Sequence, residues 1–283
     1  MDLPVNVLAI TSHVVYGHVG GQAAVLPLQL LGHEVWHLPT VLFSNHPAHG
    51  SFRGEPLPAD KIEDLLQGLV EHGFLGRAAA LLSGYLGRPE TAAVVCRALD
   101  ALRRARADAL YCCDPVLGDQ GRVYVADGLV EAFRTHLVPR ADILTPNRFE
   151  LGLLAEAPVE TLPEVLAAAA RLRRQGDGIV VCTSAAVTAD AVTTVAVGEA
   201  GAFAVDTPRR EAVPHGTGDL FAAAFLARYL DGRDLGASLR HAAAAVDAAI
   251  AVSLEAATGE LELVAAREAL AAPGPLPVVR RLD

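Results

Sequence analysis

The chain has 283 residues, of which 52% are hydrophobic, and its mean hydropathy of +0.34 implies an extensive buried core. Its net charge of −10 argues against nucleic acid or an anionic membrane as partner, because either would require an excess of Lys and Arg. No apolar run reaches the roughly 18 residues that span a bilayer, and Met1 is followed by Asp2 rather than by a signal segment, so we expect a cytoplasmic protein.

Short apolar runs alternate with helical segments along most of the chain. Strands are predicted at residues 5–10, 35–41, 79–83, 109–113, 142–145 and 179–183. Helices are predicted at residues 22–31, 60–70, 89–103, 127–137 and 162–174. The strands are almost continuously apolar, which is typical of a parallel sheet covered by helices on both faces.

The last third of the chain departs from this alternation. Residues 192–197 and 202–205 predict an antiparallel hairpin at one edge of the sheet, and helices follow from Gly216, over 235–252 and around 260–271. No linker, repeat or low-complexity tract divides the sequence. We therefore expect residues 1–283 to form one three-layer α/β domain.

The four cysteines lack the spacing of a zinc site. Cys112 and Cys113 are adjacent in a predicted strand, so their side chains should point to opposite faces of the sheet. We expect Cys96, Cys112, Cys113 and Cys182 to be buried, reduced thiols.

The segment from His215 to Phe221 carries the clearest chemical signal. Gly216 and Gly218 allow a tight turn into a helix whose first N–H groups are unpaired and lie at the positive end of the helix dipole, which is an anion-binding arrangement. Asp219 lies in the first turn, where a carboxylate of low pKa could accept a proton from a hydroxyl that attacks a bound phosphate. The alternative is that Thr217 is only an N-cap and Asp219 only complements the dipole.

Polar residues also follow the first three predicted strands, and in an open parallel sheet ligands bind at the carboxyl ends of the strands. Ser12 follows the first strand, the run from Phe43 to His46 follows the second, and Tyr85 follows the third. Each has a structural alternative, namely a turn serine, a loop histidine with a local hydrogen bond, and an amphipathic tyrosine at the rim.

Carboxylates follow the fourth and fifth strands. Asp114 and Asp119 flank a turn that contains proline and glycine, an arrangement that suits a hydrated Mg²⁺ shared with phosphate oxygens, although acids are also common in turns. Asn147 and Glu150 have the spacing of a capping box after Thr145 and Pro146, and Glu150 would also lie on the same rim as Asp114.

Taken in order, these motifs resemble the pyridoxal kinases, which are vitamin B6 kinases of the ribokinase superfamily. The resemblance extends from about residue 5 to about residue 255. It is carried by residues 12–17, 43–46, 84–87, 114–119, 145–150, 183–184 and 216–219.

The resemblance implies ATP-dependent phosphorylation of the 5′-hydroxyl of pyridoxal, and possible action on pyridoxine and pyridoxamine. Asp219 would be the catalytic base, and the N–H groups of residues 216–218 would form the anion hole. The resemblance implies a larger set of contacts: Ser12, Val41, Phe43, His46, Tyr85 and Tyr124 with the substrate; Asp114, Asp119, Thr145 and Glu150 with Mg²⁺ and a monovalent cation, commonly K⁺; and Asp114, Asn147, Glu150, Thr183, Ser184, Gly216, Thr217 and Gly218 with ATP. It also implies a homodimer.

Three residues depart from the family pattern. Many pyridoxal kinases have threonine at the position of Pro47, glutamine at that of Leu42 and asparagine at that of Gly21. Residues 185–205 match poorly, which leaves the adenine pocket unassigned. Two other functions are therefore compatible with the sequence: a hydroxymethylpyrimidine kinase of the same fold, and a weakly catalytic B6-binding protein.

Overall fold

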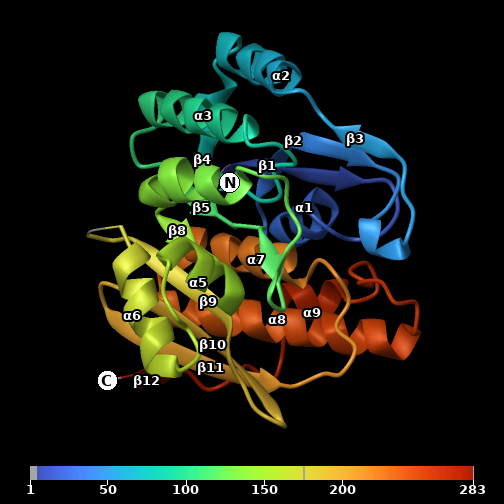
Figure 1. Cartoon of the computed structure of the whole chain (residues 1–283), viewed down its shortest axis with the longest axis vertical. Helices are drawn as coiled ribbons and strands as arrows, with labels where there is room; N and C mark the ends of the chain where they lie inside the picture. Colours follow the sequence, from blue (N-terminus) through green and yellow to red (C-terminus); the bar gives the residue numbers. More distant parts are fainter. Residues whose placement is uncertain (1–4, 175, 283) are drawn as a thin grey trace.

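A ten-stranded sheet forms the centre of the molecule in the computed structural model, which describes residues 5–174 and 176–282. The strands lie in the order β12-β11-β10-β9-β8-β5-β4-β1-β2-β3 (Figure 1). The strands from β9 to β2 in this order are parallel, whereas β3 at one edge and β10, β11 and β12 at the other are antiparallel. The bounds are β1 (Asn6–Val14), β2 (Glu34–Phe43), β3 (Gly54–Pro56), β4 (Ala78–Ser83), β5 (Leu110–Cys113), β8 (Ile143–Leu144), β9 (Ile179–Val187), β10 (Ala191–Gly198), β11 (Gly201–Pro208) and β12 (Arg280–Leu282).

Helices cover both faces of this sheet (Figure 1). One apolar core is shared with α1 (Gly21–Leu30), α7 (Thr217–Gly232), α8 (Leu235–Ala256) and α9 (Arg267–Ala271). The other is shared with α2 (Ala59–Glu71), α3 (Thr91–Ala105), α4 (Leu129–Ala132), α5 (Arg148–Ala155) and α6 (Leu162–Leu172). The predicted three-layer α/β architecture, with a mostly parallel sheet and an antiparallel hairpin, is confirmed.

The central strands are apolar on both faces, because successive side chains point to opposite faces of the sheet and a layer of helices covers each face. Cys112 and Cys113 illustrate this, since the first packs into the core with α7 and α8 and the second into the core with α3. All four cysteines are free thiols, and Cys96 is half-buried while the other three are buried. The expected burial is confirmed for Cys112, Cys113 and Cys182 and is wrong for Cys96.

Helix α8 is long and apolar enough by length and composition to cross a membrane. However, 56% of its most apolar window is buried inside the protein, and the helix packs against α7 and β11. Its apolar character is therefore explained by its place in the core.

Several short elements were not predicted. Strands β3 and β12 add to the two edges, and β6 (Gly118–Asp119) pairs with β7 (Arg122–Val123) as a separate small hairpin. Strand β1 continues to Val14 instead of ending at residue 10, because its last residues still pair with β2.

The helix predicted around 260–271 was too long, since α9 begins only at Arg267. Leu261 and Leu263 are both fully buried at a spacing of two residues, which is not the spacing of a helix face. Gly259 has a φ of +80° and the Thr258 hydroxyl accepts a hydrogen bond from the N–H of Glu260, so the chain turns here instead of continuing a helix.

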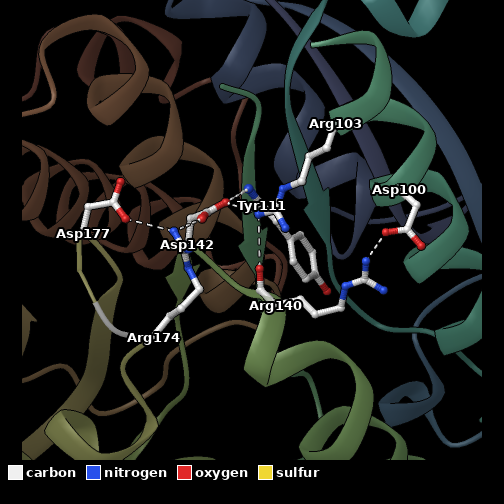
Figure 2. Close-up of polar contacts among 7 residues, drawn as sticks. All are labelled: Asp100, Arg103, Tyr111, Arg140, Asp142, Arg174 and Asp177. Atoms are coloured by element: carbon white, nitrogen blue, oxygen red, sulfur yellow. Dashed lines mark hydrogen bonds and ion pairs between the residues drawn. The ribbon is translucent and has the colours of Figure 1, made fainter. Parts of the chain in front are cut away.

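Asp142 ties the amino ends of the central strands together (Figure 2). Its carboxylate accepts hydrogen bonds from Arg103 (2.7 Å), from Arg174 (2.5 Å) and from the backbone N–H of Tyr111 (2.6 Å). Because Asp142 precedes β8 and Tyr111 lies near the start of β5, this network is at the opposite end of the strands from the predicted site. We assign it a structural role.

Candidate active site

The carboxyl ends of the parallel strands bring the predicted motifs to one edge of the sheet. Hydrogen bonding between neighbours continues past the strands: Gly84 donates to the carbonyl of Ile10, Asp114 to that of Ser83, and Thr145 to that of Cys113. Segments that are about 30 to 75 residues apart in the sequence are thereby held side by side.

Helix α7 begins at this edge with an open N-terminus. Its N-cap, Gly216, has a φ of +92°, and a Cβ at this position would come 2.1 Å from the carbonyl oxygen of His18, so only glycine fits. Helix geometry leaves the N–H groups of Thr217 and Gly218 without partners inside the helix. Gly218 is exposed, and no atom lies within 4 Å of the position that a Cβ on it would occupy. This end of the helix has the room and the donors to bind an anion.

Asp219, in the first turn of α7, is held from the opposite side by the N–H of Gly20, which donates to its Oδ2 at 2.9 Å. Its Oδ1 lies 3.7 Å from the position that a Cβ on Gly84 would take. The negative charge of Asp219 contributes to raising the pKa of Asp114, which shows that the start of α7 and the segment after β5 are neighbours.

The expectation of a low pKa for Asp219 was wrong. Burial raises the pKa of this carboxyl group to about 6, although its hydrogen bonds from Gly20 and from its own backbone act to lower it. Desolvation of the charged form therefore outweighs both the N–H donors and the helix dipole. A carboxylate with this pKa is a stronger base than an ordinary aspartate.

The other carboxylates at this edge have unequal surroundings. Asp114 is buried and accepts a hydrogen bond from the Thr145 hydroxyl at 2.8 Å. Burial, followed by the charges of Asp219 and Glu150, raises its pKa well above the ordinary value. Asp119 is exposed on β6 and accepts from the N–H of Gln120.

Glu150 forms the predicted capping box of α5 with Asn147. Its Oε2 accepts from the N–H of Asn147 at 2.9 Å, and its Oε1 accepts from the N–H groups of Leu117 (2.9 Å) and Gly118 (3.4 Å). Burial raises its pKa to about 8, and these three donors act in the opposite direction. Glu150 therefore orients the segment that follows Asp114, a structural task that a helix cap alone would not predict.

The donor set suits a hard cation that is bound together with a ligand. In the described part of the chain, no group of three or more His, Cys, Asp or Glu side chains is arranged to hold a metal ion alone. Asp114, Thr145 and Glu150 nevertheless form a buried, oxygen-rich cluster whose carboxyl pKa values are raised. Such a cluster fits Mg²⁺ or K⁺ that takes its remaining ligands from water or phosphate oxygens.

Most of the residues predicted for a substrate ring also come together. Val41 and Phe43 are buried in a small cluster with Val14 and Val19, and Tyr85 packs against it. Ser12 is buried nearby, 2.0 Å from the position that a Cβ on Gly20 would occupy. Tyr124, by contrast, is 56% exposed and is placed by its N–H donating to the carbonyl of Leu117.

Leu42 does not share the side of Val41 and Phe43. It is 46% exposed and lies between two buried residues of the same strand, so its side chain points to the other face. Pro47 begins the short 3-10 helix Pro47–His49, and the ring of His46 just before it stacks on His215 with a centroid distance of 4.3 Å.

The residues predicted for ATP lie on the other side of the carboxylates. Thr183 forms a β-bridge with Asn147, and the Asn147 amide donates to the carbonyl of Gly118 at 2.8 Å. Ser184 is exposed and has a φ of +50°, an uncommon conformation for a residue other than glycine. Asp119, Asn147 and Ser184 border a cavity of about 840 Å³.

The sequence interpretation missed three residues that organise this site. Gly20 supplies the N–H that holds Asp219, Gly84 packs closely against Thr11 beside the same carboxylate, and His215 stacks on His46. The glycine-rich turn at 17–21 was a usable signal for Gly20. Nothing in the spacing indicated the contact of His215.

The sheet order, the two helix layers and the open end of α7 beside buried carboxylates define the ribokinase-like class of small-molecule kinases.

Comparisons with known proteins place the chain within this class. Residues 40–263 match the family model of phosphomethylpyrimidine kinase. The chain is 43% identical to the pyridoxal kinase PdxY of Rubrobacter xylanophilus over 282 residues, which cover 98% of this chain and 97% of that protein. It is 39% identical to the pyridoxal kinase PdxY of Corynebacterium diphtheriae, with 95% and 96% covered. The chain belongs to the pyridoxal kinase family.

A solved structure gives the same relationship. The pyridoxal kinase from Leishmania donovani in complex with ADP and pyridoxamine superposes with a TM-score of 0.93 at 30% identity, and the match covers 98% of this chain and 99% of that chain.

Proposed function

We propose that this chain transfers the γ-phosphoryl group of ATP to the 5′-hydroxyl of pyridoxal, and of the related vitamers pyridoxine and pyridoxamine. The observation that carries this proposal is the placement of Asp219, a carboxylate with a pKa of about 6 at the open N-terminus of α7. The names of the relatives and the ADP and vitamer complexes of the Leishmania donovani enzyme support the choice of substrates.

In the proposed reaction, Asp219 accepts the proton of the 5′-hydroxyl as the hydroxyl oxygen attacks the γ-phosphorus, and the bond from the γ-phosphorus to the β,γ-bridging oxygen breaks to release ADP. The N–H of Gly20 holds Oδ2 of this carboxylate, so the base has a defined orientation before substrate binds. The N–H groups at residues 216–218 bind the phosphoryl oxygens and stabilise the charge that spreads over them. No Walker lysine is required, because the helix end supplies the donors.

We assign the remaining contacts on the same basis. The Val41, Phe43 and Tyr85 cluster, with Ser12, His46 and Tyr124 around it, would hold the pyridine ring. Asn147, Thr183 and Ser184, together with Asp114 and Glu150, would face ATP, next to the cavity beyond the β6–β7 hairpin.

Mg²⁺ and K⁺ are part of the proposal. Burial is the largest cause of the raised pKa values of Asp114, Glu150 and Asp219, and a bound cation would compensate these carboxylates. Asp114 and Thr145 would contact the ions directly, whereas Asp119 and Glu150 would act through water. A bound Mg²⁺ would neutralise charge on the phosphate oxygens.

Replacement of Asp219 by asparagine tests the assignment of the base. Asp219→Asn keeps the size of the side chain and removes the proton acceptor, so turnover of pyridoxal should fall by at least roughly 10² while the affinity for ATP stays within a factor of about two. ADP release in a coupled assay and calorimetric titration with an ATP analogue measure the two quantities. Retained turnover would contradict the role of Asp219.

A hydroxymethylpyrimidine kinase is the second candidate, because the matching family model is that of phosphomethylpyrimidine kinase, a name that points to a related pyrimidine substrate. Both substrates are planar heteroaromatic alcohols that the same ring cluster could hold. A spectrophotometric comparison of kcat/KM for pyridoxal and for hydroxymethylpyrimidine separates the two functions, and we expect pyridoxal to be preferred.

We further propose that the chain acts as one domain over residues 1–283, as a homodimer, in the cytoplasm. The relatives named above match it over almost their whole length, which supports a single functional unit. Sedimentation equilibrium at micromolar concentration measures the oligomeric state.

A further inference from the structure

The loop that carries His46 is attached to a distant part of the chain. His49, three residues further on, forms an ion pair with Glu260, with 2.7 Å between Nε2 and Oε1. Its other ring nitrogen, Nδ1, lies 2.9 Å from the carbonyl oxygen of His46. Both partners are oxygens, one of a carboxylate and one of a backbone carbonyl, so His49 donates at both nitrogens.

An imidazole can donate at both nitrogens only when it is protonated. The pKa of His49 is accordingly raised, first by the hydrogen bond to the His46 carbonyl and then by Glu260. The groups that face His49 are Glu260 from the segment after α8, Tyr16 from the loop after β1, and His46 from its own loop. Of these, only Glu260 supplies the negative charge that favours the doubly donating form.

Glu260 is itself held in place. Its side chain is only 16% exposed, and its N–H donates to the hydroxyl of Thr258. The neighbouring Glu262 is anchored to α8, because its N–H donates to the buried Ser253 hydroxyl at 2.9 Å. The segment after α8 is therefore a fixed base for the contact with His49.

The same segment also contacts the loop that precedes Gly20. The ring of His18 lies 2.6 Å from the carbonyl oxygen of Leu261. A Cβ on Gly17 would come 2.4 Å from Oε2 of Glu260, so this glycine allows the carboxylate to approach the loop closely. One short segment thus contacts both loops that border the substrate side of the site.

At its other end, the connection reaches the anion site. His46 stacks on His215, the residue immediately before Gly216. Burial, followed by the proximity of His215 and His49, lowers the pKa of His46 to about 4, so His46 is neutral at neutral pH. Its Nδ1 accepts from the N–H of Ala48, which leaves the proton on Nε2 as a donor.

We propose that Glu260 is a positioning residue for the vitamer: by keeping His49 doubly donating, it holds the backbone and ring of His46 over the start of α7. This inference rests on the proposed function, since the ligand it concerns is the vitamer. Loss of the negative charge removes the ion pair: a neutral His49 that donates from Nδ1 to the His46 carbonyl can only accept at Nε2, so the loop is held to residue 260 by a weaker, uncharged contact and His46 is less firmly positioned.

The test compares Glu260→Gln with Glu262→Gln. Glu262 accepts a hydrogen bond from Thr258 in the same segment but has no contact with the 44–50 loop in the described structure, so it is a matched control. We expect E260Q to raise the KM for pyridoxal roughly fivefold, as for a partly exposed ion pair, with kcat and the KM for ATP within a factor of about two. E262Q should leave all three constants unchanged within the same factor.

Two further measurements separate positioning from a general loss of structure. In a double-mutant cycle, E260Q combined with His49→Gln should raise the KM no more than either change alone, because both break the same contact. In the wild type the KM for pyridoxal should rise with pH as His49 loses its proton, and E260Q should show this rise at lower pH.

An unchanged KM in E260Q, an equal effect of E262Q, or additive effects in the cycle would each overturn the proposal. A wild-type chain that phosphorylates no vitamer would overturn the proposed function. In that case calorimetric titration with pyridoxal tests the role of Glu260. The inference stands only if E260Q binds pyridoxal more weakly than the wild type does.

Discussion

Replacement of Gly218 by alanine should make the protein more stable and the enzyme less active. Gly218 lies in the first turn of α7 with an ordinary helical φ, and nothing lies within 4 Å of the position of an added Cβ. The folded state therefore has no steric reason for a glycine here. The reason must lie in a ligand that approaches the helix end.

The two effects can be estimated separately. Alanine is favoured over glycine in a helix by roughly 0.5–1 kcal/mol, which corresponds to a rise in Tm of roughly 1–3 °C in a chain of this size. The Cα–Cβ bond tilts toward the N-terminus of the helix, so the new methyl group would enter the space that the phosphoryl group occupies. Displacing the ligand from one well-placed donor costs roughly 10²–10³ in kcat.

Thermal unfolding followed by circular dichroism and ADP release in a coupled assay measure the two quantities on the same sample. Gly68→Ala is the matched control, because Gly68 lies inside α2, also has no atom within 4 Å of an added Cβ, and is far from the site in sequence. It should gain similar stability and keep full turnover. Wild-type turnover in Gly218→Ala would refute the assignment of this helix end as the phosphoryl site.

Two more predictions follow from the same geometry. Gly20→Ala should lower the free energy of unfolding by roughly 2–4 kcal/mol, because alanine disfavours the positive φ at this position and its Cβ would lie 2.0 Å from the Ser12 hydroxyl. The same change should reduce kcat, because it shifts the N–H that holds Asp219. Gly32 also has a positive φ, of +91°, but has free space around it. Gly32→Ala should therefore lower the free energy of unfolding only by the cost of that φ and leave kcat unchanged, as denaturant titration and assay would show. Burial raises the pKa of Asp219 from 3.8 to about 6 and that of Glu150 from 4.5 to about 8, so these two groups bind more protons in the folded state than in the unfolded state. Below about pH 6.5, His46 and His241 act in the opposite direction, because their pKa values are lowered to about 4. The free energy of unfolding of the metal-free protein should therefore fall as pH rises from about 6.5 to 8, and Mg²⁺ should reduce the fall; a Tm that rises over this range without metal would contradict this.

The architecture was predictable because its signals are long and local. Helices such as α3 have the apolar periodicity of a helix face, and strands such as β4, buried at every position, are short continuous apolar runs that end in turn residues. Strands β3 and β12 have three residues each, and their side chains are mostly exposed, so no apolar pattern marks them. Their pairing depends on a neighbouring edge that the local sequence does not contain.

The site was predictable where a residue acts through its own motif. Gly216 to Asp219 and the capping box of Glu150 are encoded within a few residues, and the resemblance supplied their order. The contacts of Gly20 with Asp219 and of His49 with Glu260 join positions about 200 residues apart. Such contacts follow from the crossing of the chain over the sheet and have no local signal.

The pKa of Asp219 shows why even a well-recognised motif did not give the chemistry. Position in a first helical turn favours the charged form by roughly 0.3–1 kcal/mol, whereas removal of a carboxylate from water disfavours it by more, and this burial depends on how the rest of the chain packs around Asp219, which the motif does not encode. A base with a pKa of about 6 is still roughly nine-tenths ionised at pH 7, so it gains proton affinity at little loss of the reactive form. A cation bound at Asp114 would lower this pKa again, because the two carboxylates interact. The cation that completes the phosphate site must therefore weaken the base beside it, and the burial of Asp219 leaves a margin for that loss.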